Sequence, residues 1–419
     1  MNKPKLCVLH RYPITQAIET NPSLYDFLKI MTTNGFGIRF VSFSEEKNAQ
    51  RTHVEIPPGV EIVALPFTLR RNRPLDKYLK SVLFLFLTPF IARVVRQDER
   101  ILGVYCDDSL PFYGYLVKKL TNRRVILRLG DLQTGYMLSG RSAAYDAVFK
   151  LLHRIEVHTW KAVDGLATIS RPFEDYVRRS GVTPDRILTI PESVDTQEFH
   201  PIDTVEVRVK FGIPSDCVLL MFHGVIEPLK GLDILLDNLS KLDSSLLNKV
   251  KLMIIGNGGS IGDLRKRASD LGLDDEVIWV GWVPFKMMPQ FINACDVGVP
   301  MRSANFANNF VVTLGLLQYW ACGKPVLAPR LKAISAIVHD GENGETYDPR
   351  KPSEFSEKIR LLMTERTSRL DEGREGRRLV CEAFDKSVVA QALYLGVTRL
   401  LSAEKQTSWT HFDSDLSIS

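Results

Sequence analysis

The chain has 419 residues, of which 45% are hydrophobic and 25% charged, and its formal net charge is +5. This length is too great for one ordinary hydrophobic core and predicts two domains of about 150–200 residues each. The mild positive charge suits an anionic ligand or an acidic membrane surface. It excludes the dense basic surface that is typical of nucleic-acid-binding proteins.

The six cysteines lie far apart and form no Cys-x-x-Cys pair. Several lie inside apolar runs, and we interpret these as small buried side chains in a reducing cytosol. The first residues lead directly into a short strand, without the apolar core of a signal peptide. The apolar stretch Ser81–Ala92 is interrupted by Pro89 and is shorter than the roughly 20 residues that span a bilayer. We therefore expect a cytoplasmic protein that is either soluble or bound to the cytoplasmic face of a membrane.

The amino-terminal half alternates short apolar runs with helical segments. A helix that begins at Asn21-Pro22 follows the first run. Such alternation predicts parallel sheets with right-handed crossovers. The predicted strands of this half are Leu6–Leu9, Ile38–Phe43, Val60–Leu65, Ile101–Tyr105, Val125–Leu129, Gly165–Ile169 and Ile187–Pro191.

A second series of strands and helices begins after Pro201, which places a domain boundary near residues 200–210. Two helices are predicted in this series, at Leu232–Leu242 and at Val312–Cys322, where Gly323 and Pro325 end the second one. The predicted strands are Cys217–His223, Lys251–Ile255, Val277–Val280, Val297–Pro300 and Pro325–Ala328.

The predicted domains follow from these two series. Residues 1–203 form an amino-terminal domain and residues 204–385 a carboxyl-terminal domain. Residues 386–402 form a last helix that packs back on the amino-terminal domain. The polar residues 403–419 are expected to be a loose tail.

The segment from Phe222 to Gly231 has the pattern of a phosphate site. Gly224 allows the backbone to turn after a strand, and Lys230-Gly231 stand at the start of a helix. Backbone amides at a helix N-terminus, with a lysine beside them, can bind phosphate oxygens. Taken alone, the pattern is more typical of a turn with a solvated lysine, so the interpretation depends on the segments downstream.

Four downstream segments support the phosphate site by their order and spacing, namely Leu252–Gly259, Val277–Gly281, Ala294–Pro300 and Leu316–Ala328. Together they resemble the donor-binding half of family 4 glycosyltransferases, and Ile190–Asp195 resembles the interdomain segment of that family. The resemblance covers roughly residues 155–345. It implies an α/β protein of the GT-B fold, in which two Rossmann-like domains with parallel sheets face each other across a cleft. The first domain would bind an acceptor and the second a nucleotide-sugar donor.

The resemblance implies roles for residues 224–231. In the family, an arginine directly after the first glycine and a lysine five positions later bind the donor diphosphate. Here Gly224, Lys230 and Gly231 match this pattern, whereas Val225 stands at the arginine position. Lys230 would therefore both bind the donor and stabilise the departing diphosphate during catalysis.

The family also has two glutamates, eight positions apart, that hold the sugar and the ribose. The second aligns with Gln318, which can still hydrogen-bond to ribose hydroxyls. The first aligns with Phe310, which cannot hydrogen-bond through its side chain. The expected replacements are the side chains of Asn308 and Asn309 and the backbone amides near Val311 and Val312.

Acceptor-side residues are expected at the carboxyl ends of strands in the first domain, where open α/β sheets bind ligands. Asp131 follows a central strand, in the region where the family carries a catalytic histidine. It is either a catalytic residue or an ordinary turn cap. Arg128 precedes it, and His10 and Arg11 follow the first strand.

The resemblance implies a retaining transfer without a metal or cofactor. We identify no Asp-x-Asp motif of the type that metal-dependent sugar transferases use, and no His/Cys ligand cluster. The acceptor would be a hydroxyl of a sugar or glycolipid, as in the synthesis of a surface polysaccharide. In residues 69–92, five cations precede an aromatic-rich apolar run. This pattern indicates either a membrane contact or a buried helix with a basic flank.

Two other classes of protein remain as alternatives. Val225 and Phe310 are consistent with a GT-B protein that has lost catalysis and serves as a nucleotide-binding or scaffold protein. A dehydrogenase is disfavoured, because the glycines of residues 256–259 do not match the Gly-x-Gly-x-x-Gly pattern of dinucleotide-binding proteins.

Overall fold

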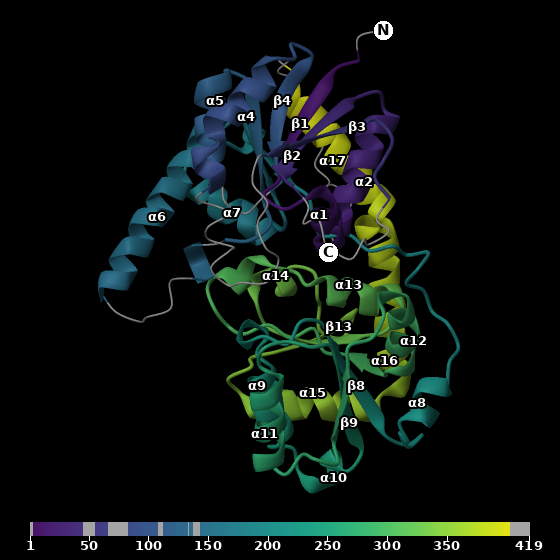
Figure 1. The fold of residues 1–419 in the computed structure, drawn as a ribbon. Coiled ribbons are helices and arrows are strands. Elements are labelled where there is room, and N and C mark those ends of the chain that lie inside the picture. Colours follow the sequence, from purple (N-terminus) through teal and green to yellow (C-terminus); the bar gives the residue numbers. More distant parts are fainter. Residues whose placement is uncertain are drawn as a thin grey trace.

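The computed structural model describes residues 3–44, 55–65, 83–107, 112–132, 134–136 and 143–402. Figure 1 shows two α/β halves, one above the other, each built around its own sheet. The predicted basic segment before residue 83 and the predicted tail 403–419 lie outside the described residues. None of the described helices is long and apolar enough to cross a membrane.

The amino-terminal sheet has the strand order β3-β2-β1-β4-β5-β6-β7, and all neighbouring pairs are parallel. Its strands are β1 Lys5–Leu9, β2 Gly37–Phe43, β3 Val60–Leu65, β4 Ile101–Cys106, β5 Arg124–Leu129, β6 Gly165–Thr168 and β7 Ile187–Thr189. Its helices are α1 Ile14–Thr20, α2 Pro22–Thr33, α4 Thr88–Arg96, α5 Phe112–Thr121, α6 Ala143–Ala162 and α7 Arg171–Arg179. Helices cover both faces, which is why a strand such as β1 is apolar on both sides.

The carboxyl-terminal sheet has the order β10-β9-β8-β11-β12-β13 and is also parallel throughout. Its strands are β8 Val218–His223, β9 Val250–Ile255, β10 Val277–Gly281, β11 Val297–Gly298, β12 Val326–Pro329 and β13 Gly344–Tyr347. Its helices are α8 Glu206–Lys210, α9 Leu232–Leu239, α10 Ser244–Leu247, α11 Ile261–Asp270, α12 Met288–Ala294, α13 Leu314–Ala321, α14 Lys332–Ser335, α15 Pro352–Thr364 and α16 Arg366–Leu379. Both sheets thus share the order 3-2-1-4-5-6 of the Rossmann fold.

Every predicted strand has a counterpart in the structure, most of them with shifted ends, but β13 was not predicted. Its sequence is Gly-Glu-Thr-Tyr, and a buried carboxylate, that of Glu345, stands where an apolar side chain would have marked a strand. Lys358 of α15 pairs with Glu345 at 2.5 Å. An ion pair between two elements leaves no hydrophobic run in the sequence, so the strand could not be recognised from it.

The last helix, α17 Lys386–Leu401, packs against the amino-terminal domain beside α2 (Figure 1). Val389, Leu393 and Val397 lie in the core that β1 and α2 also build. At the end of the helix, Arg124 donates to the carbonyl oxygen of Leu400 at 2.8 Å. The chain therefore returns to its first domain after completing the second.

The two segments of chain that cross between the domains are bonded to each other. Val194 and Asp385 form a β-bridge, and Lys386 pairs with Asp195. Val194 and Phe199 already pack in the carboxyl-terminal core. The crossing therefore lies ahead of the predicted boundary at residue 203.

A second link joins the domains on the side of α7. The loop before α13 inserts Phe310 into the amino-terminal core, where its ring stacks on that of Phe173 at 5.2 Å and contacts that of Tyr176 at 5.1 Å. Ser170 donates to the carbonyl oxygen of Phe310 at 2.7 Å. Helix α7 lies on the left of Figure 1 and α17 on the right, so the links made by these two helices hold the halves on both sides.

Candidate active site

A cleft of about 2000 Å³, open to solvent, lies between the two domains. Its walls come from the carboxyl ends of strands in both sheets. In each sheet the strand order reverses once, between β1 and β4 and between β8 and β11, and ligands of open α/β sheets bind at such points. His10 and Asp107 follow β1 and β4, and His223 and Arg302 lie at the carboxyl ends of β8 and β11, so both switch points open on the same cleft.

Nine of the predicted site residues line this cleft. They are His10, Arg11, Arg128 and Asp131 from the amino-terminal domain and Gly224, Lys230, Val311, Val312 and Gln318 from the carboxyl-terminal domain. The structure therefore brings together residues that are more than 300 positions apart in the sequence.

Lys230 ends a short 3-10 turn, and the next residue, Gly231, has a left-handed φ of 69° before α9 begins. Burial, and to a smaller extent the charge of Arg302, lower the pKa of Lys230 to about 8, while Asp131 across the cleft acts in the opposite direction. The ammonium group has no ion pair within the described part of the chain. A partly desolvated cation in this position favours an anionic ligand.

His223 ends β8 beside Lys230. Its ring packs edge-on against Tyr319, with ring centroids 5.0 Å apart, and its buried Nε2 has no hydrogen-bond partner in the described residues. Burial and the charge of Lys230 lower the pKa of His223 to about 4. The imidazole is therefore neutral at pH 7, and its Nε2 can act as either a donor or an acceptor, depending on the tautomer.

The N-terminus of α13 forms the next part of the wall. Thr313 caps the helix by accepting from the backbone N–H of Leu316 at 3.3 Å, while Leu314 and Gly315 lie on the cleft. The first amides of a helix carry partial positive charge and bind anions. One turn further, Gln318 is only 3% exposed and also reaches the cleft.

On the opposite wall, Arg128 is held between two carboxylates. Its guanidinium donates to Asp107 and to Glu192, each at 3.2 Å. Burial alone would lower the pKa of Arg128, but the charges of Asp107 and Glu192 raise it above its ordinary value. Arg128 thus fixes two acidic groups on the cleft wall, and a ligand there meets carboxylates as well as the arginine.

Sequence reasoning missed Asp107 and Glu192. Asp107 directly follows β4 at the switch point. Knowledge of the strand order would therefore have been enough to identify Asp107 as a candidate site residue. Glu192 belongs to the segment that resembles the interdomain motif. Neither position stands out in the sequence, because the ion pairs that organise them join segments 21 and 64 residues from Arg128.

The loop after β1 contributes an aromatic and two basic groups. The backbone N–H of Tyr12 donates to His10 Nδ1 at 3.0 Å, and the guanidinium of Arg11 lies over the Tyr12 ring, 5.2 Å from its centroid. These contacts fix the loop on the amino-terminal side of the cleft.

Asn308 and Asn309 do not line the cleft, and their predicted place in it is corrected. The side chain of Asn308 is completely buried and donates to the carbonyl oxygen of Ser303 at 2.8 Å. That of Asn309 donates to the carbonyl oxygen of Asn305 at 3.1 Å. Short polar side chains in a tight loop bond first to neighbouring backbone groups. Gly231, which was also predicted to bind the donor, lies behind Lys230 and does not line the cleft.

The architecture matches that of solved two-domain structures. One is HepE of Anabaena in complex with UDP and glucose, with a TM-score of 0.70, 17% identity and coverage of 94% of this chain and 99% of that chain. Another is sucrose-phosphate synthase of Thermosynechococcus elongatus, with a TM-score of 0.76, 15% identity and coverage of 96% and 100%. Two Rossmann-like halves across one cleft define the GT-B class of fold.

Within this class, residues 203–379 match the model of the family described as glycosyl transferases group 1. The D-inositol 3-phosphate glycosyltransferase of Acidothermus cellulolyticus is 33% identical over 44% of this chain and 42% of its own length. That of Thermobifida fusca is 29% identical over 75% of each chain. In its alignments with the first seven such relatives, this chain spans less than half of their length, 42–49%.

Proposed function

We propose that the chain is a glycosyltransferase that moves a sugar from a nucleotide-diphosphate sugar to an acceptor hydroxyl without a cofactor. The observation that carries the proposal is the meeting of both switch points at one cleft. Lys230 and the N-terminus of α13 line one wall, and Asp131 and Arg128 line the other. Gln318 would hydrogen-bond to the ribose, and Lys230 with the α13 amides would hold the diphosphate.

The proposed reaction breaks the bond between the anomeric carbon and the donor phosphate oxygen and forms one to the acceptor oxygen. Negative charge that develops on the departing diphosphate is stabilised by Lys230 and the helix N-terminus, which are in place before the reaction. The acceptor hydroxyl loses its proton in the same process, and the carboxylate of Asp131 is the proposed catalytic group that accepts it. Retention of configuration and independence from metal ions are part of the proposal because of the family resemblance. An NMR spectrum of the product anomer tests the first, and an assay with EDTA tests the second.

The acceptor wall supports a polar, hydroxyl-bearing acceptor such as a sugar or a glycolipid. His10, Arg11 and Arg128 supply donors, and Asp107 and Glu192 supply acceptors. The relatives are named for D-inositol 3-phosphate, and basic groups on this wall are compatible with a phosphorylated acceptor as well. An acceptor panel therefore includes inositol phosphate, simple sugars and glycolipids.

We propose further that the protein binds the cytoplasmic face of a membrane, which would bring it to a lipid-linked acceptor. The side chains of Phe86 and Phe90 are 75% and 41% exposed, and Arg93 and Arg96 are exposed on the same helical segment. Such a stripe suits an interface with anionic lipids. Flotation with phosphatidylglycerol vesicles tests it, and Phe86→Ser with Phe90→Ser should abolish the binding.

The deciding experiment is a screen of thermal stability and donor hydrolysis with UDP-, GDP- and ADP-sugars, with Lys230→Ala beside the wild type. Ligand at 100 times its dissociation constant should add about 2.7 kcal/mol of stability. Stabilisation and turnover with one donor, both lost in Lys230→Ala, are the expected result. Binding without turnover with any acceptor would instead favour the catalytically inactive nucleotide-binding protein.

A further inference from the structure

The donor wall lacks one charge relative to the family pattern. Val225 occupies the position of the arginine that binds the diphosphate in the family, and its side chain is 59% exposed on the cleft. On that pattern, Lys230 alone would face a group with two negative phosphates. The structure contains a second cation on this wall, which comes from a different strand.

Arg302 lies just beyond β11, at the switch point of the carboxyl-terminal sheet, and lines the cleft together with Lys230. The two side chains are close enough for the charge of Arg302 to lower the pKa of Lys230. Two like charges that lie close together on one wall repel each other, and a diphosphate bound between them would offset this repulsion.

The backbone holds this pair together. A Cβ atom on Gly231 would lie 3.0 Å from the backbone nitrogen of Ser303 and 3.1 Å from its Cα, so the missing side chain of Gly231 allows the two loops to touch. Ser303 donates to the carbonyl oxygen of Leu229 through its backbone N–H at 3.1 Å and through its hydroxyl at 3.0 Å. The turn that carries Lys230 and the loop that carries Arg302 thus form one unit.

Asn308 orients the arginine. Arg302 Nη1 donates to Asn308 Oδ1 at 3.2 Å, while the amide nitrogen of Asn308 donates to the carbonyl oxygens of Ser303 and Leu229 at 2.8 Å and 3.3 Å. A fully bonded, buried amide has one orientation, so the guanidinium that it holds is also fixed.

We propose that Arg302 supplies the second cation for the donor diphosphate, in place of the arginine that the family carries at the position of Val225, and that Asn308 is its positioning residue. The inference rests on the proposed function. A planar guanidinium can bind two phosphate oxygens at once, and such charge-assisted bonds are stronger than neutral ones. The pair Arg302 and Lys230 would therefore select a diphosphate over a monophosphate or a bare nucleoside.

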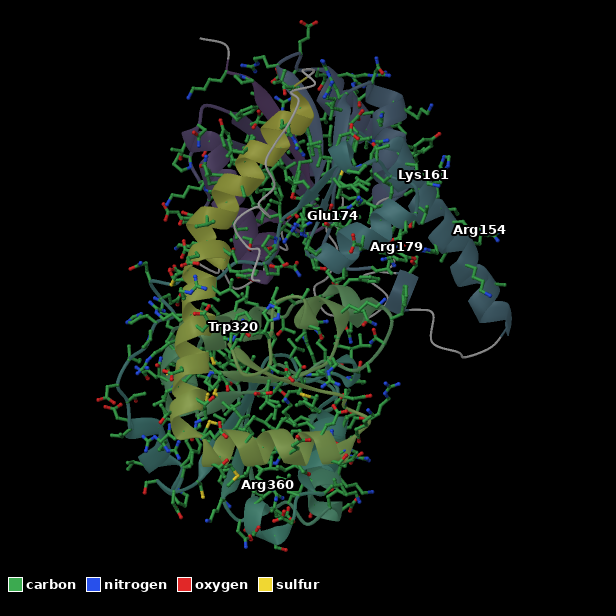
Figure 2. The ribbon with its side chains drawn as sticks, turned by 180° about the vertical axis from the view of Figure 1, so that it is seen from behind. Arg154, Lys161, Glu174, Arg179, Trp320 and Arg360 are labelled. Carbon is green, nitrogen blue, oxygen red and sulfur yellow. The ribbon has the colours of Figure 1, made fainter. Side chains whose placement is uncertain are left out.

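The test measures the dissociation constants of UDP, UMP and uridine by calorimetry, with GDP or ADP and their analogues if the donor screen selects these. Arg302→Gln removes the charge but keeps a hydrogen-bond donor near Asn308. It should weaken UDP binding by about tenfold or more, equivalent to about 1.4 kcal/mol, and leave uridine binding unchanged. Arg360→Met is the control for lost charge, because Arg360 is exposed at the end of the carboxyl-terminal domain that lies farther from the other domain (Figure 2).

A rescue separates this role from a merely structural one. Val225 is exposed on the cleft, so Val225→Arg in the Arg302→Gln background should restore most of the UDP affinity by returning the cation to the family position. If Arg302→Gln does not fold, Arg302→Lys serves instead. It keeps one charge but loses the planar fork, and it should still weaken UDP binding about threefold or more without changing uridine binding.

Several outcomes would overturn the inference. One is UDP affinity that stays at the wild-type value in Arg302→Gln or Arg302→Lys. A second is an equal loss of UDP and uridine binding in these variants. A third is a double variant, Val225→Arg with Arg302→Gln, that binds UDP no more tightly than Arg302→Gln alone. Absence of binding to any nucleoside diphosphate by the wild type would instead contradict the proposed function, so the two failures are distinguishable.

Discussion

Lys230 and His223 show how the cleft prepares single residues for an anion. Both lie partly buried on the same wall, and this desolvation disfavours the charged form of each, so their pKa values fall to about 8 and about 4. His223 is neutral throughout the physiological range, whereas Lys230 titrates just above it. Binding of a diphosphate would raise the pKa of Lys230 again, because the charged form then has a partner.

This titration makes a prediction for donor affinity. The ammonium form of Lys230 binds the diphosphate, and it is lost as the pH rises through about 8. Between pH 7 and pH 9.5 the dissociation constant of UDP should therefore increase about tenfold or more. In Lys230→Arg the same titration should be nearly flat, because a guanidinium stays charged over this range. Calorimetry at four pH values checks the slopes, and a wild-type affinity that is independent of pH would contradict the role of Lys230.

At the scale of elements, the 3-10 turn before α9 and the loop after β11 work as one binding unit. The turn can approach the loop only because Gly231 has a left-handed backbone and no side chain. The sequence indicated the turn, since Lys-Gly before an apolar helix is a local pattern. The contact with Ser303 joins segments more than 70 residues apart and left no such local pattern.

Gly231→Ala should therefore lower the free energy of unfolding by more than the strain of a left-handed backbone alone accounts for. Gly212 has a similar φ of 60°, but a Cβ atom added there would meet no other atom within 4 Å, so it is the matched control. Gly212→Ala should lower the free energy of unfolding by about 1–2 kcal/mol and leave UDP binding unchanged. Gly231→Ala should lower it further, because Ser303 must move, and should weaken UDP binding. Denaturant unfolding and calorimetry measure both effects. Equal stabilities and equal affinities would show that the contact between turn and loop is unimportant.

At the scale of the whole molecule, two links hold the domains and frame the cleft. On one side, α17 returns to the first domain, and on the other Phe310 inserts into the aromatic cluster around Phe173 and Tyr176. Phe310 is the residue that aligns with a sugar-binding glutamate of the family. The structure places its side chain in the core of the other domain instead of the cleft, and this explains why a phenylalanine is accommodated there.

Restoring the family residue should consequently damage the protein. Phe310→Glu would bury an unpaired carboxylate among aromatic rings and should lower the free energy of unfolding by at least about 3 kcal/mol. Phe310→Leu keeps an apolar side chain and should cost about 1–2 kcal/mol, mainly through the lost ring contacts. Denaturant unfolding compares them. A Phe310→Glu protein that is as stable as wild type and binds UDP-glucose more tightly would mean that residue 310 faces the cleft.

The sequence by itself determined the two-domain α/β class, nearly all strands, the Lys230–Gly231 turn and the position of Gln318 on a helix. These features depend on local periodicity and on glycine, proline and apolar residues that are near neighbours in the chain. Only the tertiary structure decided that Arg302 lies beside Lys230, that Asn308 turns inward to hold it, and that Phe310 anchors one domain in the other. Each of these features depends on which distant segments of the chain pack together. For buried polar groups and interdomain contacts, the packing that forms is the one in which the hydrogen bonds and charges of both segments find partners. No single segment of the sequence contains both partners.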